Sequence, residues 1–160
     1  MSKVALAIAE LHRSERVLAR ALRATAARHH SDQDISHLAQ DLAAWSDDHV
    51  KELADHGRHY GLRLSARRRR LWLSPGFTER ISAALRRRPE PALLLLADLR
   101  RIHRAAAGVS LDWELLGQAA QATKNHELLA LTARCHPQSL RQMRWSNAML
   151  KELSPQALST

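Results

Sequence analysis

The segments LHRSERVLARAL (residues 11–22) and LAAWSDDHVKELADHGRHYGL (residues 42–62) decide the fold. They belong to two helical patterns, residues 3–30 and 32–60, which meet at the short sequence HHSDQD. Side chains spaced by three and four positions lie on one face of a helix. The inward stripe of the first pattern reads Val4, Ile8, Leu11, Glu15, Leu18 and Leu22, and that of the second reads Ile35, Leu38, Leu42, Trp45, His49, Leu53, His56 and Tyr60. The spacing therefore predicts a helical hairpin with polar residues in its interior.

Two further helices complete the prediction. Only five Gly and five Pro occur in 160 residues, and no strand pattern is present, which is typical of an all-α protein. Capping and turn residues place the four helices at Ser2 or Lys3 to Arg28, Ser31 or Asp32 to about Gly61, Glu90 or Pro91 to a turn at residues 123–125, and from there to Pro155. Pro137 is expected to kink or split the last helix, because proline lacks the backbone N–H that a helix interior requires.

Residues 63–90 differ from the rest of the chain. A connection of this length inside a compact domain is expected to have a function or structure of its own. Ser74 and Pro75 fit the N-cap and first position of a helix, and Phe77, Ile81 and Leu85 then give a short amphipathic helix. The prediction is a single domain over residues 1–160: a four-helix bundle of two antiparallel hairpins, joined by one long crossover that contains an extra short helix.

The net charge of +9 is concentrated in the middle of the chain. Thirteen Arg and three acidic residues lie between Arg58 and Arg104, whereas acidic and basic residues nearly balance elsewhere. The single Cys135 excludes an intramolecular disulfide and fits a reducing compartment. The longest apolar run, residues 92–97, is far shorter than the ~20 residues of a membrane-spanning helix. We therefore expect a cytoplasmic protein without a transmembrane segment or signal peptide.

The chain resembles the ferritin-like superfamily, and is most like its small bacterial stress-response members. The resemblance rests on the two segments quoted above and on VSLDWELLGQAAQATKNHELLAL (residues 109–131) around the last turn, and it spans nearly all of the chain except 63–90. It implies a ferritin-like four-helix bundle. It also implies a homodimer, because small ferritin-like proteins often pair. Some ferritin-like proteins associate with DNA through basic extensions.

The metal ligands that the resemblance would imply are degenerate. Ferritin-like di-metal enzymes use a Glu from each of two helices and a Glu-x-x-His motif from each of the other two. Glu15 fits the single-Glu position of the first helix, but no Glu in the sequence is followed three residues later by His. Trp45 stands about where a ligating carboxylate is needed, and the fourth helix offers only the amides Gln138, Gln142 and Asn147. We therefore expect no complete di-metal centre and assign no catalytic residue.

Glu15 and His49 have two interpretations. The preferred one is a buried hydrogen-bonded pair that fixes the register of the first hairpin. The alternative is a single metal ion, iron or another divalent cation, held by Glu15, His49 and His12. Most other histidines, including His29 and His136, fall at expected helix ends, turns or outer faces, where a solvated or capping role is usual.

The basic crossover has three interpretations. Its candidate residues for binding a polyanion are Arg67, Arg68, Arg69, Arg70, Trp72, Arg86, Arg87 and Arg88, with Trp72 available for stacking on a base. The same composition suits an anionic membrane surface. A solvated crossover whose apolar residues cover the bundle or a partner subunit is the preferred interpretation, because charge runs are more often solvated than functional.

Taken together, the sequence favours a non-enzymatic binding or scaffold protein without a resident cofactor. Two alternatives stay open. One is a metal-binding ferritin-like oxidase or storage protein that uses Glu15 and His49. The other is a nucleic-acid or polyanion binder that uses the Arg-rich crossover.

Overall fold

The protein is all-helical over the residues that the structure describes. This structure is a computed structural model that describes residues 2–67 and 90–159. It contains four helices, α1 (Lys3–Arg28), α2 (Gln33–Arg58), α4 (Pro91–Ala122) and α5 (His126–Ser159), and no strand within those ranges. None of these helices is long and apolar enough to cross a membrane. The short amphipathic helix predicted between residues 74 and 88 lies outside the described residues.

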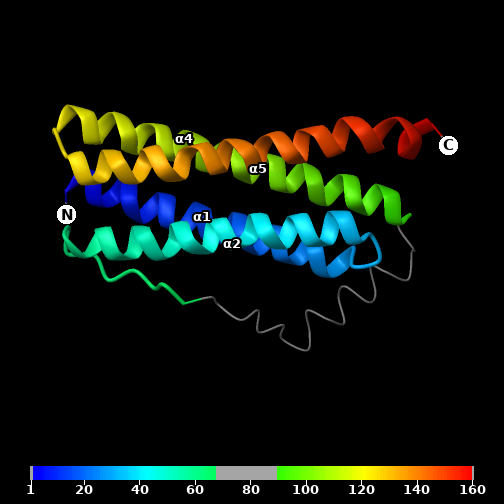
Figure 1. The fold of residues 1–160 in the computed structure, drawn as a ribbon, viewed down its shortest axis with the longest axis horizontal. Helices are drawn as coiled ribbons and strands as arrows, with labels where there is room; N and C mark the ends of the chain where they lie inside the picture. Colours follow the sequence, from blue (N-terminus) through cyan, green and yellow to red (C-terminus); the bar gives the residue numbers. More distant parts are fainter. Residues whose placement is uncertain (1, 68–89, 160) are drawn as a thin grey trace.

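The four helices form two antiparallel hairpins packed side by side (Figure 1). α1 packs on both α2 and α4, whereas α2 makes few contacts with α5. At one end of the bundle Arg28, the last residue of α1, is 2.7 Å from Asp98 near the start of α4. At the other end the Tyr60 hydroxyl, just after α2, accepts a hydrogen bond of 2.7 Å from Asn125 in the turn before α5. The chain therefore crosses the length of the bundle between α2 and α4, and these two helices run in the same direction.

The predicted starts of the helices are confirmed by their caps. The Ser2 hydroxyl accepts a hydrogen bond from the Ala5 N–H, and the Asp32 carboxylate accepts one from the Ile35 N–H. These side chains satisfy backbone donors that have no partner within the first turn of a helix. Gly61, the expected helix-ending residue, has a φ of 75°, which glycine adopts without steric cost.

The last helix is continuous through Pro137, which excludes the split but not the kink that was predicted there. α5 is one helix from His126 to Ser159, so Pro137 does not split it and Pro155 does not end it. A proline inside a helix has no N–H to donate to the backbone carbonyl one turn before it. Because both prolines are exposed, that carbonyl lies on the water-facing side of α5, where water can be its donor. The first turn of α5 is capped by Asn125, whose side chain accepts a hydrogen bond from the Leu128 N–H.

The core follows the predicted stripes with two exceptions. Ile8, Leu11, Leu18 and Leu22 are fully buried. Leu38 was expected to face inward but is 44% exposed beside Met149 and Leu153 of α5. Asn147 of α5, also expected at or near the interior, is exposed. Both errors arise where α2 and α5 approach each other only sparsely, so a helical period alone does not tell which residues a neighbour covers.

Candidate functional site

The centre of the bundle contains a buried acid–base pair. Glu15 of α1 and His49 of α2 are 0% and 2% exposed, and Nδ1 of His49 is 2.6 Å from Oε1 of Glu15. The structure thus brings together one polar residue from each of the two stripes of the first hairpin. A distance this short is typical of a hydrogen bond between charged groups.

Both ring nitrogens of His49 lie within hydrogen-bond distance of an oxygen atom. Nδ1 faces the Glu15 carboxylate, and Nε2 is 2.7 Å from the Oε1 atom of Gln138 in α5. Each of these partners is an oxygen acceptor, and an imidazole with two acceptors binds both only when it carries two protons. The arrangement therefore selects the imidazolium form, which together with the Glu15 carboxylate is electrically neutral.

The pKa of His49 agrees with this geometry. Burial lowers it, but hydrogen bonds to Cys135 and Glu15, together with the negative charge of the Glu15 carboxylate, raise it from the ordinary 6.5 to about 10. Cys135 is itself buried and reduced. Its closeness to His49 could not be inferred from sequence, because the thiol arrives from a helix more than eighty positions away.

Trp113 of α4 is a third partner that the sequence pattern did not reveal. Its indole N–H donates to Oε1 of Glu15 at 2.8 Å, and its ring meets that of His49 edge to face, with centroids 5.6 Å apart. Trp113 is fully buried and belongs to the hydrophobic core. Its indole N–H could have indicated a polar partner from the sequence, because a buried indole usually donates a hydrogen bond to an acceptor. The other oxygen of Glu15, Oε2, is buried without a hydrogen-bond partner among the described residues.

A second polar bridge lies along the same interior. Gln142 of α5 is fully buried, and its amide donates to the Leu42 carbonyl at 2.8 Å and to the Ser46 hydroxyl at 2.9 Å. Gln138 and Gln142 are therefore inward-facing, as expected from their positions. Together they tie α5 to α2 where apolar contacts between these helices are few.

His12, the third candidate metal ligand, does not join Glu15 and His49. Its Nε2 is 3.0 Å from the carbonyl oxygen of Ser65, in the segment that follows α2. Burial lowers the pKa of His12, the Ser65 hydrogen bond raises it, and the charge of Arg16 lowers it, with a net decrease. Across residues 2–67 and 90–159, no three His, Cys, Asp or Glu side chains converge in a way that would hold a metal ion.

A buried ionic cluster joins α1 to α4. Nη1 of Arg28 is 2.7 and 2.8 Å from the two carboxylate oxygens of Asp98, and His29 and Arg101 are 2.9 and 3.2 Å from it. Asp98 is 2% exposed. His29 was expected to have a solvated or capping role at a helix end, and it is the C-cap of α1. Its side chain is nevertheless buried, because α4 begins beside the end of α1. Asp98 was not identified from sequence, since its partners lie about seventy positions away. The cluster is a structural contact between the hairpins.

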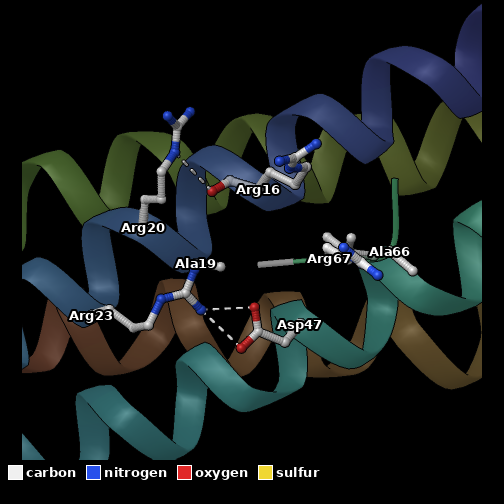
Figure 2. Close-up of a pocket in the computed structure, with 8 residues that line it drawn as sticks. Arg16, Ala19, Arg20, Arg23, Asp47, Ala66 and Arg67 are labelled. Carbon is white, nitrogen blue, oxygen red and sulfur yellow. Dashed lines mark hydrogen bonds and ion pairs between the residues drawn. The ribbon is translucent and has the colours of Figure 1, made fainter. Parts of the chain in front are cut away.

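Of the residues predicted to bind a polyanion in the basic crossover, the structure describes only Arg67. Arg67 is exposed, and Arg68, Arg69, Arg70, Trp72, Arg86, Arg87 and Arg88 lie outside the described residues. Arg67 borders a surface cleft between α1 and α2 (Figure 2), which we call the arginine cleft. Its lining residues are Arg16, Ala19, Arg20, Arg23, Asp47, Val50, Ala66 and Arg67.

Comparisons with protein-family models, with curated proteins and with solved structures find no match to this chain. The function must therefore be argued from the buried network and from the arginine cleft.

The buried pair predicts strong energetic coupling between Glu15 and His49. Glu15→Leu and His49→Leu should each lower the free energy of unfolding by about 3–5 kcal/mol, because each leaves a buried polar partner uncompensated. The double variant should lose at least about 2 kcal/mol less than the sum of the single losses. Urea denaturation of the four proteins measures this. The exposed pair Glu10 and Arg13, 2.8 Å apart, is the control and should show coupling below about 1 kcal/mol. Additive losses at Glu15 and His49 would contradict the assigned pair.

The raised pKa of His49 predicts a loss of stability in alkaline solution. Between its unfolded value of 6.5 and its folded value of about 10, the native state holds a proton that the unfolded chain has released. The free energy of unfolding should therefore fall as pH rises through this range, with a slope of up to about 1.4 kcal/mol per pH unit from this group. Urea denaturation across the range should give a shallower slope for His49→Gln. Equal slopes would show that His49 is not held as the imidazolium.

Proposed function

We propose that this chain is a non-enzymatic binding or scaffold protein with a ferritin-like bundle, in which a hydrogen-bonded polar network replaces a complete di-metal centre. The proposal includes a cytoplasmic homodimer of the stress-response type, an expectation that rests on the sequence resemblance. The two antiparallel hairpins and the long connection between α2 and α4 are compatible with the ferritin-like layout.

The observation that carries the non-enzymatic proposal is the state of His49. Its two ring nitrogens are both engaged with oxygen acceptors, so neither presents a lone pair to a metal ion. Among the described residues, Glu15 is the only carboxylate in contact with His49, and the imidazolium balances its charge. A divalent cation could bind here only by displacing a proton from His49. Among the described residues, the site also offers no further anionic ligand to such a cation. The arrangement supports the structural interpretation over a redox or storage role.

The alternative of a metal-binding oxidase or storage protein is tested by elemental analysis. The wild type, Glu15→Ala and His49→Ala are reconstituted aerobically with iron, manganese and zinc, and unbound metal is removed. We expect no more metal in the wild type than in either variant, because the network offers no free ligand set. Glu10→Ala, which removes an exposed carboxylate from the same helix, is the control for surface binding. Two ions per chain that both variants lose would overturn the proposal and establish an oxidoreductase or storage site.

A second candidate function, polyanion binding, is favoured by the arginine cleft. Arg16, Arg20 and Arg67 have no carboxylate within ion-pair distance among residues 2–67 and 90–159, although they border one cleft. Three guanidinium groups that border one cleft and have no carboxylate partner in the described part of the chain attract phosphate-bearing chains.

Fluorescence anisotropy of a labelled single-stranded oligonucleotide tests this candidate. The logarithm of the binding constant for the oligonucleotide should fall linearly with the logarithm of the salt concentration. The slope should be about −2 or steeper, as expected when three or more basic side chains displace counterions from a single strand. A variant in which Arg67, Arg68, Arg69 and Arg70 are all replaced by Gln should show a shallower slope. Binding that does not respond to salt, or the absence of binding at about 50 mM salt, would exclude the candidate.

A further inference from the structure

We infer that the arginine cleft is a phosphate-binding site that holds the backbone of a nucleic-acid strand. The inference rests on the polyanion candidate and deepens it by naming the residues, the ligand group and the mode of recognition. It uses only side chains on α1, on α2 and in residues 66–67, so it does not depend on the rest of the crossover.

The cleft is built by three pieces of chain. Arg16, Arg20 and Arg23 recur at intervals of four and three on α1, so they share one face of that helix. Asp47 of α2 forms the opposite wall, and Arg67 approaches from the segment after α2 (Figure 2). The space between them that no atom fills, including the open mouth, is about 290 Å³.

The segment that carries Arg67 is anchored at three points. Leu62 and Leu64 pack against the hydrophobic core. A Cβ atom at Gly57 would lie only 3.2 Å from Leu64, so the absence of a side chain there lets the segment run close to α2. The Ser65 carbonyl accepts a hydrogen bond from the buried His12 of α1. Arg67, two residues further on, is therefore brought to the cleft by the packing of the bundle.

Arg23 and Asp47 form the fixed wall of the site. Nη1 of Arg23 is 2.7 and 2.8 Å from the two oxygens of Asp47, and the Asp47 side chain is 11% exposed. This ion pair balances one positive charge. Arg16, Arg20 and Arg67 have no such balance among the described residues, so a net excess of positive charge borders the cleft.

The excess charge is unfavourable without an anion. Like charges four residues apart on a helix repel each other, and this is the spacing of Arg16 and Arg20. Arg16 is also half-buried, which weakens its contact with water and strengthens its attraction for an anion in the cleft. A guanidinium group donates two parallel hydrogen bonds to a phosphate, which a hydrated point charge such as Lys does not do. The cleft is lined by four Arg and no Lys, which suits phosphate binding through such paired hydrogen bonds.

The lining of the cleft favours a nucleic-acid strand over a membrane. A membrane-binding surface combines basic residues with protruding apolar side chains that insert among the lipids. The apolar residues here are Ala19 and Val50, both buried, and the small Ala66. The described cleft also presents no aromatic side chain that would stack on a base. Contacts to phosphate alone position a strand without reading its sequence. We therefore expect binding that does not depend on base sequence.

The test compares two double variants that change the net charge equally. Arg16→Gln with Arg20→Gln removes two guanidinium groups from the cleft. Arg100→Gln with Arg104→Gln removes two exposed guanidinium groups, also four residues apart, from α4. Gln is a good helix former, so both variants should retain the fold, which circular dichroism and urea denaturation check. The probe is a labelled oligonucleotide with the anisotropy readout described above.

We expect the cleft variant to weaken binding about tenfold and to reduce the salt slope by about 1.4, the value for two phosphate contacts on a single strand. The α4 variant should change both quantities much less. Two oligonucleotides of unrelated sequence should give equal affinities. Competition by inorganic phosphate and by phosphatidylserine vesicles is measured alongside, and the oligonucleotide should be the tightest ligand.

The other outcomes overturn the inference in distinguishable ways. If the wild type binds and the two double variants weaken binding equally, the cleft is not a site, although polyanion binding through general charge stands. If the cleft variant binds as well as the wild type, the cleft is likewise excluded. If vesicles outcompete the oligonucleotide through Arg16 and Arg20, the ligand is a membrane surface. If the wild type binds no oligonucleotide at about 50 mM salt, both the cleft and the polyanion candidate fail.

Discussion

The hydrogen bond between Glu15 and His49 is the contact on which the interior of this bundle depends. It joins α1 to α2 at 2.6 Å within a region that excludes water. The same pair receives Trp113 from α4 and Gln138 from α5, so every helix contributes to one network. Such a network fixes helix register more strictly than apolar packing does, because a shift of one residue would leave buried charges without partners.

This network also determines what the interior can do. A carboxylate and an imidazolium neutralise each other, and the ring of His49 has no lone pair to offer while both of its neighbours accept hydrogen bonds from it. The closed electrostatic balance of this network contrasts with the surface, where Arg16, Arg20 and Arg67 border one cleft without matching carboxylates among the described residues. The proposed binding site is therefore on the outside of the bundle, and the proposed role of the buried network is structural.

The buried ionic cluster around Asp98 shows how the hairpins are held to each other. Its partners come from the end of α1 and from α4 itself, and the carboxylate is almost inaccessible to water. A carboxylate at this depth is stable only when several donors surround it. The second hairpin is thus fixed to the first at one end by charge and at the centre by the network around Glu15.

The sequence by itself determined the all-α class, the cap at Ser2, a cap at Ser31 or Asp32, and the inward position of Glu15 and His49, because helical period and capping chemistry are local. Only the tertiary structure decided what these residues meet. The indole of Trp113 reaches Glu15 from almost a hundred positions away, and the exposure of Leu38 depends on how sparsely α5 covers α2. A periodic pattern gives the direction of a side chain relative to its own helix, but the partner in that direction is set by packing between helices that are distant in sequence.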